Sequence, residues 1–249
     1  MYSLFSLHEL SIVLLIRNHN HTLLNWDFLK CTGIVPQDWQ LASEPISTQN
    51  FSQIAFQNGL RIVADNSKII FTETIGEKSL VDIVVAQIAK FYTQILPYAE
   101  YQALGLNPEA FVTFPEHPEI AQNYLSKTLF FSQPWLEFGN TTPRVDLNIS
   151  YTLDQGTLNL KVAQQFIKQE DGETMTPIVV YSGNFEYMFE QFLPAERSAI
   201  LWNYLEQWQL NVETFNHLIK NQFLQGLNTP LSGVDTDTLM GLPMEMLMQ

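Results

Sequence analysis

The stretch that decides the fold is residues 51–96, FSQIAFQNGLRIVADNSKIIFTETIGEKSLVDIVVAQIAKFYTQIL. The Asn-Gly pair at 58–59 separates two apolar segments and predicts a tight hairpin, because both central residues of a type I′ turn need positive φ. The Asp-Asn-Ser triplet at 65–67 predicts a second turn, since such short polar side chains hydrogen-bond their own backbone. Residues 51–74 are therefore expected to form a three-stranded antiparallel meander.

The residues after this meander predict a helix over 79–96. Ser79 is a suitable N-cap, and Asp82 would interact favourably with the positive end of the helix. Apolar residues recur at helical spacing from Leu80 to Ile95, and β-branched neighbours widen the apolar arc. We therefore expect this helix to be covered on more than one side.

Strands are also expected on both sides of this stretch. Residues 10–16 are apolar and branched, which predicts a buried strand. Residues 98–106 and 111–114 predict one extended segment that is interrupted near Pro108.

The clearest strand alternation in the chain covers residues 145–153. The Asp-Gln-Gly triplet at 154–156 predicts a turn, and a return strand follows over 157–166. Residues 178–189 predict a third strand, in which Gly183 suggests a bulge or a bend.

Helices are predicted over residues 115–131, with Pro118 in the first turn, and over 194–223 in two runs. Because strands precede helices in blocks, the order favours the α+β class. The expected architecture is antiparallel meanders with long helices packed on one face.

The expected domain organisation is a single domain over residues 1–228 and a Met-rich C-terminal tail over 229–249. A meander followed by a helix occurs twice. Residues 1–114 and 115–228 could therefore be two similar halves, although no residue-level repeat is evident.

The formal net charge is −14, from 12 basic and 26 acidic residues. This balance argues against nucleic-acid binding, which needs clustered cations, and against docking on anionic membranes. The apolar run at residues 10–16 is too short to span a membrane, and no basic segment precedes it. Cys31 is the single cysteine, so no internal disulfide can form, and we expect a cytoplasmic location.

Candidate chemical residues are few. His19 and His21 could ligate zinc, copper or nickel, but no further ligand follows at a suitable spacing, so a polar surface loop is favoured. Cys31 has no recognisable catalytic surroundings and is expected to be a passive thiol. Asp235 and Asp237 form a carboxylate pair without supporting ligands, in a tail expected to be flexible.

Sequence motifs of common enzymes are lacking. No Gly-rich phosphate loop, nucleophile elbow or Walker lysine motif occurs, and the acidic triplet Glu170, Asp171 and Glu173 is expected to be a solvated loop. An enzyme is therefore not favoured, and no cofactor or metal is expected. Scattered residues could still converge in the fold.

The C-terminal methionines form the most informative cluster. Four of the seven methionines lie there, namely Met240, Met244, Met246 and Met248. Methionine is flexible and polarisable and suits adaptable docking surfaces. The functional hypothesis is a segment that docks on a partner protein or on a second copy of the chain. The alternative is a tail that is disordered or lies on its own domain.

The Phe56-Gln-Asn-Gly-Leu segment, the helix after it, and Tyr101-Gln-Ala-Leu-Gly-Leu-Asn107 together resemble a group of bacterial cytosolic α+β proteins without an assigned activity. The resemblance covers residues 51–114. It implies an α+β fold, and no activity or site residue is carried over from it.

Three functions remain open at this point. The first is a non-enzymatic protein-binding or scaffold module that self-associates as a small homo-oligomer such as a homodimer. The second is a domain that binds a small apolar ligand between sheet and helix, which an aromatic cavity there would favour. The third is an enzyme with a dispersed site, which converging His, Asp or Glu residues with perturbed pKa values would favour.

Overall fold

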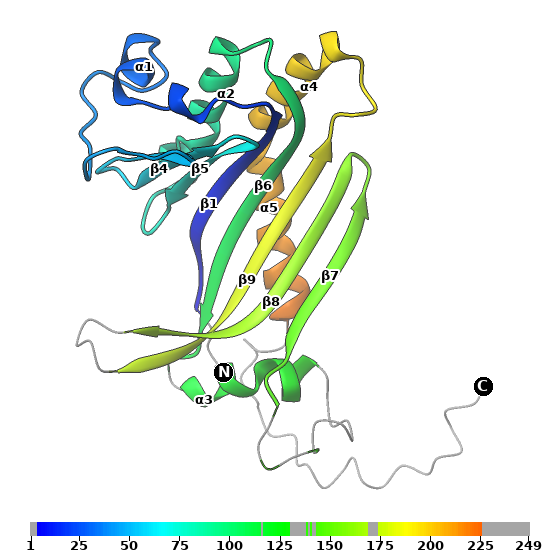
Figure 1. Cartoon of the computed structure of the whole chain (residues 1–249). Helices are drawn as coiled ribbons and strands as arrows, with labels where there is room; N and C mark the ends of the chain where they lie inside the picture. Colours follow the sequence, from blue (N-terminus) through cyan, green and yellow to red (C-terminus); the bar gives the residue numbers. More distant parts are fainter. Residues whose placement is uncertain are drawn as a thin grey trace, which may run out of the picture.

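The computed structural model describes residues 4–115, 117–129, 138, 140, 143–168 and 174–225. These residues build one antiparallel sheet of nine strands in the order β2-β3-β4-β5-β1-β6-β9-β8-β7 (Figure 1). The strands are β1 (Leu4–Arg17), β2 (Ile46–Ser47), β3 (Phe51–Ala55), β4 (Leu60–Asp65), β5 (Lys68–Thr74), β6 (Glu100–Thr113), β7 (Asp146–Leu153), β8 (Gly156–Lys168) and β9 (Met175–Met188).

The two long strands β1 and β6 pair with each other at the centre of the sheet. The predicted meander of β3, β4 and β5 extends the sheet beyond β1, and the meander of β9, β8 and β7 extends it beyond β6. The α+β class and both predicted meanders are therefore confirmed. The similarity of the two halves stays a prediction.

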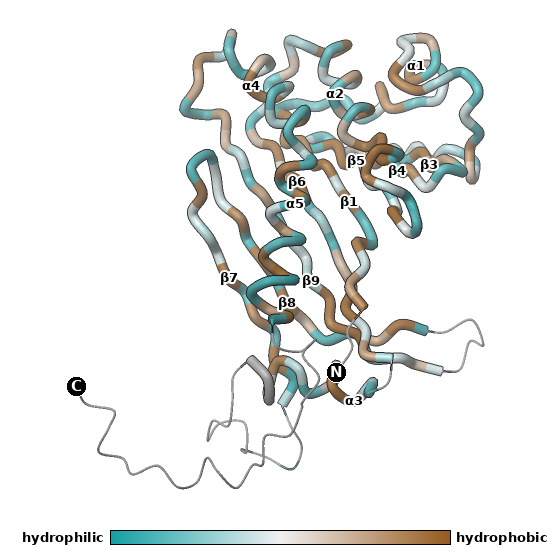
Figure 2. Tube along the Cα trace, turned by 180° about the vertical axis from the view of Figure 1, so that it is seen from behind, coloured by the Kyte–Doolittle hydropathy of each residue, from teal (hydrophilic) through white to brown (hydrophobic). Residues whose placement is uncertain are grey.

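The longest described helix has 13 residues, so the predicted long helices are in fact of moderate length. The helices are α1 (Trp26–Cys31), α2 (Val85–Ile95), α3 (Pro118–Asn123), α4 (Pro194–Glu206) and α5 (Trp208–Leu218). Helices α2 to α5 contact the same sheet face, which carries the alternating apolar residues of the strands (Figure 2). Within the described ranges, no helix has both the length and the apolar character needed to cross a membrane.

The core lies between this sheet face and the helices. Leu10, Ile12 and Leu14 alternate along β1 with residues of the open face, and all three are fully buried. Tyr92 of α2 is also fully buried, and its ring makes an edge contact with Phe71 of β5. Helix α2 also packs on α4, so it is covered on two sides as predicted.

The start of α2 differs from the prediction. Residues 80–82 form a 3₁₀ turn, and the Ser79 hydroxyl donates to Asp82 instead of capping backbone groups. The cap comes from Glu73 of β5, whose Oε2 accepts from the backbone N–H groups of Val84 and Val85, each at 2.8 Å. A fully buried carboxylate from a neighbouring strand thus takes the role that the sequence pattern assigned to Ser79.

The interruption predicted near Pro108 was wrong, and so was the bulge, one of the two alternatives predicted at Gly183. Strand β6 continues through Pro108, because the ladder to β9 omits this position and resumes at Glu109 in the same register. Strand β9 has no bulge at Gly183. A Cβ at Gly183 would lie 2.9 Å from the Phe215 ring, so the glycine allows α5 to approach the sheet.

Candidate functional site

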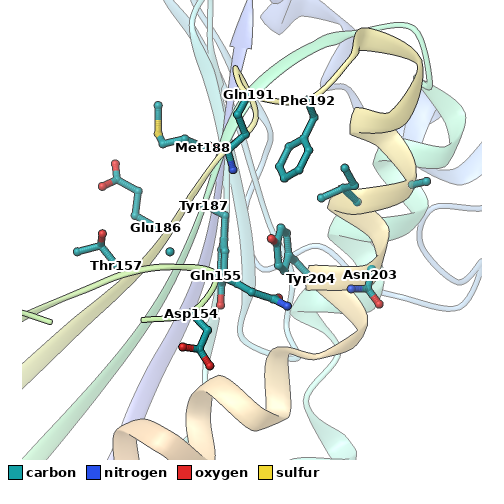
Figure 3. Close-up of a pocket in the computed structure, with 13 residues that line it drawn as sticks. Asp154, Gln155, Thr157, Glu186, Tyr187, Met188, Gln191, Phe192, Asn203 and Tyr204 are labelled. Atoms are coloured by element: carbon teal, nitrogen blue, oxygen red, sulfur yellow. The ribbon is translucent and has the colours of Figure 1, made fainter. Parts of the chain in front are cut away.

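A pocket of about 730 Å³ lies at the corner of the sheet where β7 turns back into β8. Its walls come from that turn, from the end of β9 with the loop after it, and from α4 (Figure 3). The pocket forms because β8 begins to pair with β9 only at Glu186, whereas β9 continues to pair with β6 as far as Met188. The last residues of β9 therefore have no neighbouring strand on the β8 side. We call this site the corner pocket.

Gly156 shapes the corner pocket. Its φ is 151°, which L side chains rarely adopt, and a Cβ there would lie 2.5 Å from the backbone oxygen of Glu186. The chain can therefore make this corner only with glycine. The sequence predicted the turn but not the pocket that it borders.

Aromatic rings form one wall of the corner pocket. Tyr187 of β9 and Tyr204 of α4 are stacked with ring centroids 4.1 Å apart. Behind the lining, the Phe189 ring is stacked on Tyr204 with centroids 6.3 Å apart. Phe192 adds a partly buried ring to the wall. The Tyr187 hydroxyl donates to Asn211 Oδ1 of α5 at 2.9 Å, which ties the wall to the helix layer.

Both tyrosines of the wall are neutral at physiological pH. Burial raises the pKa of Tyr187 and of Tyr204 above the ordinary value of 10.0. They offer the pocket polarisable ring surface and no negative charge.

Polar groups surround this wall. Gln155 and Asn203 lie on the side of β9 that carries Tyr187, whereas Glu186 lies on the other side, as strand alternation requires (Figure 3). The exposed turn adds Asp154. Among the described residues that line the pocket, Asp154 and Glu186 are acidic and none is basic, so the site favours neutral or cationic molecules.

The lining does not provide an acid-base pair. It contains no histidine, and its groups with shifted pKa values are the two tyrosines. Within the part of the chain that the structure describes, no three His, Cys, Asp or Glu side chains gather closely enough to hold a metal ion.

The histidines predicted to lie in a polar surface loop are in fact buried. His19 bonds the Asp65 backbone oxygen through Nδ1 at 2.7 Å and the Tyr92 hydroxyl through Nε2 at 2.8 Å. His21 bonds Ser52 Oγ and a backbone oxygen. Both imidazoles therefore connect β1 and the turn after it to the first meander, and neither has a nitrogen available for a metal.

The other predicted candidates do not meet at the corner pocket. Cys31 is a free, exposed thiol at the end of α1. The acidic triplet at 170–173, the Asp pair at 235–237 and the tail methionines Met240, Met244, Met246 and Met248 lie outside the described residues.

The aromatic residues of the pocket were predicted only as strand and helix core. Tyr187 and Tyr204 follow the alternation and the helical spacing that core residues also follow, so nothing local distinguishes them. Comparison with known proteins adds no assignment: no protein-family model matches the chain, and no curated protein matches it significantly.

Proposed function

We propose that this protein binds a small organic cation, an amine with an apolar body, in the corner pocket. The observation that carries the proposal is a lining of stacked aromatic rings and carboxylates without a basic residue. The proposal modifies the expected apolar ligand, because the lining includes the polar side chains of Asp154, Gln155, Gln191 and Asn203.

The aromatic wall supports binding of the apolar body. Pockets for small molecules commonly combine aromatic surface with a few polar groups that fix orientation. Phe192 and the stacked pair Tyr187 and Tyr204 supply that surface between sheet and helix. The amides of Gln155 and Asn203 border it and can accept hydrogen bonds from an ammonium group.

The charge of the site supports a cation. Asp154 lies at the turn beside the aromatic wall, and Glu186 borders the pocket from the other side of β9; neither forms an ion pair with a described residue. One carboxylate about 4 Å from an ammonium group contributes roughly 1 to 4 kcal/mol, depending on how far water is excluded. The net charge of −14 adds a long-range attraction for cations.

The test compares three ligands that differ in charge. Calorimetric titration with phenethylamine should show binding, whereas the anion phenylacetate should not bind and the neutral phenethyl alcohol should bind more weakly. Asn203→Arg adds a cation to the lining and should abolish amine binding. Gln209→Arg adds the same charge at an exposed helical position outside the lining and serves as the control.

Equal binding of the amine and the acid would refute the proposal, as would amine binding that Asn203→Arg leaves unchanged. Native mass spectrometry of the protein purified from its own host would show whether a stoichiometric small molecule is retained.

A second candidate function, self-association, rests on the far ends of β8 and β9. These ends form a two-stranded arm that curves away from the rest of the sheet (Figure 1). Phe166, Ile167 and Met175 on this arm are 48%, 38% and 53% exposed. An isolated hairpin is only marginally stable in water, so the arm would gain stability from covering by a second copy.

Light scattering tests this second function. A dimer that Phe166→Ser combined with Met175→Ser converts to a monomer would support it. Val81→Ser removes an exposed apolar side chain elsewhere and is the control. A wild-type chain that stays monomeric at high concentration would refute it.

A further inference from the structure

The open face of the sheet carries a row of polar side chains that crosses six strands. Helices α2 to α5 all pack on the other face, so none of them covers this row. The strand registers place the members of this row side by side. Ser11 of β1 pairs with Thr72 and with Asn107, and Asn159 of β8 pairs with Asn184 and with Ser150. Asn107 of β6 and Asn184 of β9 lie close together and join these two groups into one row. In strand order, the polar row is Thr72, Ser11, Asn107, Asn184, Asn159 and Ser150.

Hydrogen bonds within the polar row satisfy its ends but not its centre. Ser11 and Thr72 share a bond of 2.9 Å, and the Ser150 hydroxyl donates to Asn159 Oδ1 at 2.6 Å. At the centre, the side-chain oxygens of Asn107 and Asn184 are buried without a partner. Such unpaired acceptors destabilise the folded protein, so a stability role does not explain them.

Gly105 explains how both oxygens are buried. A Cβ at this position would lie 3.3 Å from Asn184 Oδ1 and 3.5 Å from Asn107 Oδ1, so the two oxygens converge above the glycine. The two amide nitrogens also form no hydrogen bond, but they are not buried. Both amides therefore direct free N–H donors away from the sheet.

These donors face a groove of about 510 Å³ on the open face. Two more amides, those of Asn148 and Asn159, line the same groove. Lys161 is the cation of the lining, and its Nζ lies 3.8 Å from Asp146 Oδ2. The groove is thus rich in neutral donors and close to balanced in charge.

This chemistry suits an uncharged ligand with many oxygen atoms. An anion would find only one, partly neutralised cation, and an organic cation would find donors instead of acceptors. Four members of the row, Asn107, Asn184, Asn159 and Ser150, line the groove, whereas Thr72 at the other end is buried. Neighbouring strands are about 4.8 Å apart, so these four residues offer hydrogen bonds over roughly 14 Å. A ligand with repeated hydroxyl groups can contact all four.

We infer that the groove centred on Asn107 and Asn184 binds a linear neutral saccharide through amide and hydroxyl hydrogen bonds. The site lies on the open sheet face and is independent of the corner pocket. Its failure would leave the amine proposal intact.

The test is an NMR titration of the full chain with cellotetraose, beside sodium sulfate and phenethylamine. Cellotetraose should shift backbone amides of the central strands. Asn107→Ala combined with Asn184→Ala should weaken this binding about tenfold or more, while the melting temperature stays equal or rises, because two unpaired acceptors are removed.

Asn216→Ala is the matched control. The Asn216 side-chain oxygen is also buried and unpaired, but this residue belongs to α5. It should leave saccharide binding unchanged. If the double variant fails to fold, Ser150→Ala with Asn159→Ala tests the same row at its outer end.

Three results would overturn the inference. The first is no shift up to the solubility limit of cellotetraose. The second is equal binding by wild type and the folded row variant. The third is that sulfate or phenethylamine shifts the same amides more strongly than the sugar.

Discussion

Replacement of Glu73 by alanine should strongly destabilise the fold. The Glu73 carboxylate is fully buried and accepts three hydrogen bonds, from Lys78 Nζ at 2.7 Å and from the backbone of Val84 and Val85. Glu73→Ala leaves an ammonium group and two N–H donors at the start of α2 without this acceptor. The helix would lose the group that connects it to β5.

The magnitude follows from these contacts. Removing one partner of a buried ion pair typically destabilises a protein by about 3 to 5 kcal/mol. Lys78 is partly exposed and can regain water, so we expect the lower end, about 3 kcal/mol. For a chain of this size, this corresponds to a melting temperature lower by roughly 6–12 °C. Glu73→Gln should lose less, about 2 kcal/mol, because its amide oxygen still accepts from the helix.

Urea denaturation followed by circular dichroism measures this loss. Glu77→Gln removes an exposed carboxylate nearby and should change stability by less than about 0.5 kcal/mol. Combining Glu73→Met with Lys78→Met should recover part of the loss of the single Glu73→Met variant, since no unpaired charge remains. The reasoning is refuted if Glu73→Ala unfolds within about 0.5 kcal/mol of the wild type.

Three further predictions concern Gly156, the hydrogen-bonded pair Tyr181 and Tyr124, and Asp65 at the turn between β4 and β5. Gly156→Ala should lower the free energy of unfolding, measured by urea denaturation, by about 2 to 4 kcal/mol, because the backbone is strained and the new Cβ would lie 2.5 Å from the Glu186 backbone oxygen. Gly33→Ala is the control and should lower it by only about 1 kcal/mol, because no atom lies within 4 Å of a Cβ at that position. Tyr181→Phe removes the hydroxyl that donates to Tyr124 at 2.9 Å and should lose about 1 kcal/mol by urea denaturation. Burial raises the pKa of Tyr124 to about 12. The stabilisation linked to this neutral hydroxyl is therefore complete below the ordinary pKa of 10.0 and is lost as pH rises through 12. Ionisation of Tyr124 near pH 10 in an ultraviolet titration would contradict this prediction. Desolvation alone would raise the pKa of Asp65, but hydrogen bonds from Ser67 and Lys68 outweigh it and hold the pKa below 3.8. The stabilisation that the ionised Asp65 carboxylate gives is therefore present above pH 3.8 and is lost as pH falls through the lowered pKa. A carbon NMR titration of Asp65 checks this.

Local patterns predicted most of the strands. The Asn-Gly pair at 58–59 and the triplet at 65–67 both mark turns that join the predicted strands. The first is not the expected type I′ turn, because Gly59 has positive φ and Asn58 does not. In the second, the Asp65 side chain accepts from the backbone N–H groups of Ser67 and Lys68, as expected. Strict alternation predicted β7 to within one residue. These signals need only neighbours in the chain, so they can be read without the fold.

The candidate sites could not be predicted in the same way. His19 and His21 looked like surface residues because their partners, Tyr92 and Ser52, lie 73 and 31 positions away. Tyr187 looked like an ordinary core residue until α4 placed Tyr204 beside it. Burial and hydrogen bonding depend on which distant segments meet.

The sequence by itself determined the α+β class, the two meanders and the alternation that selects one apolar sheet face. Only the tertiary structure decided the cap of α2 by Glu73, the corner pocket beside Gly156 and the convergence of Asn107 and Asn184 above Gly105. The physical reason is the distance along the chain between the residues that interact. Turns and hydrophobic periodicity arise from contacts between near neighbours. The helix cap, the pocket and the unpaired amides arise from strand order and register, which bring together residues far apart in the chain.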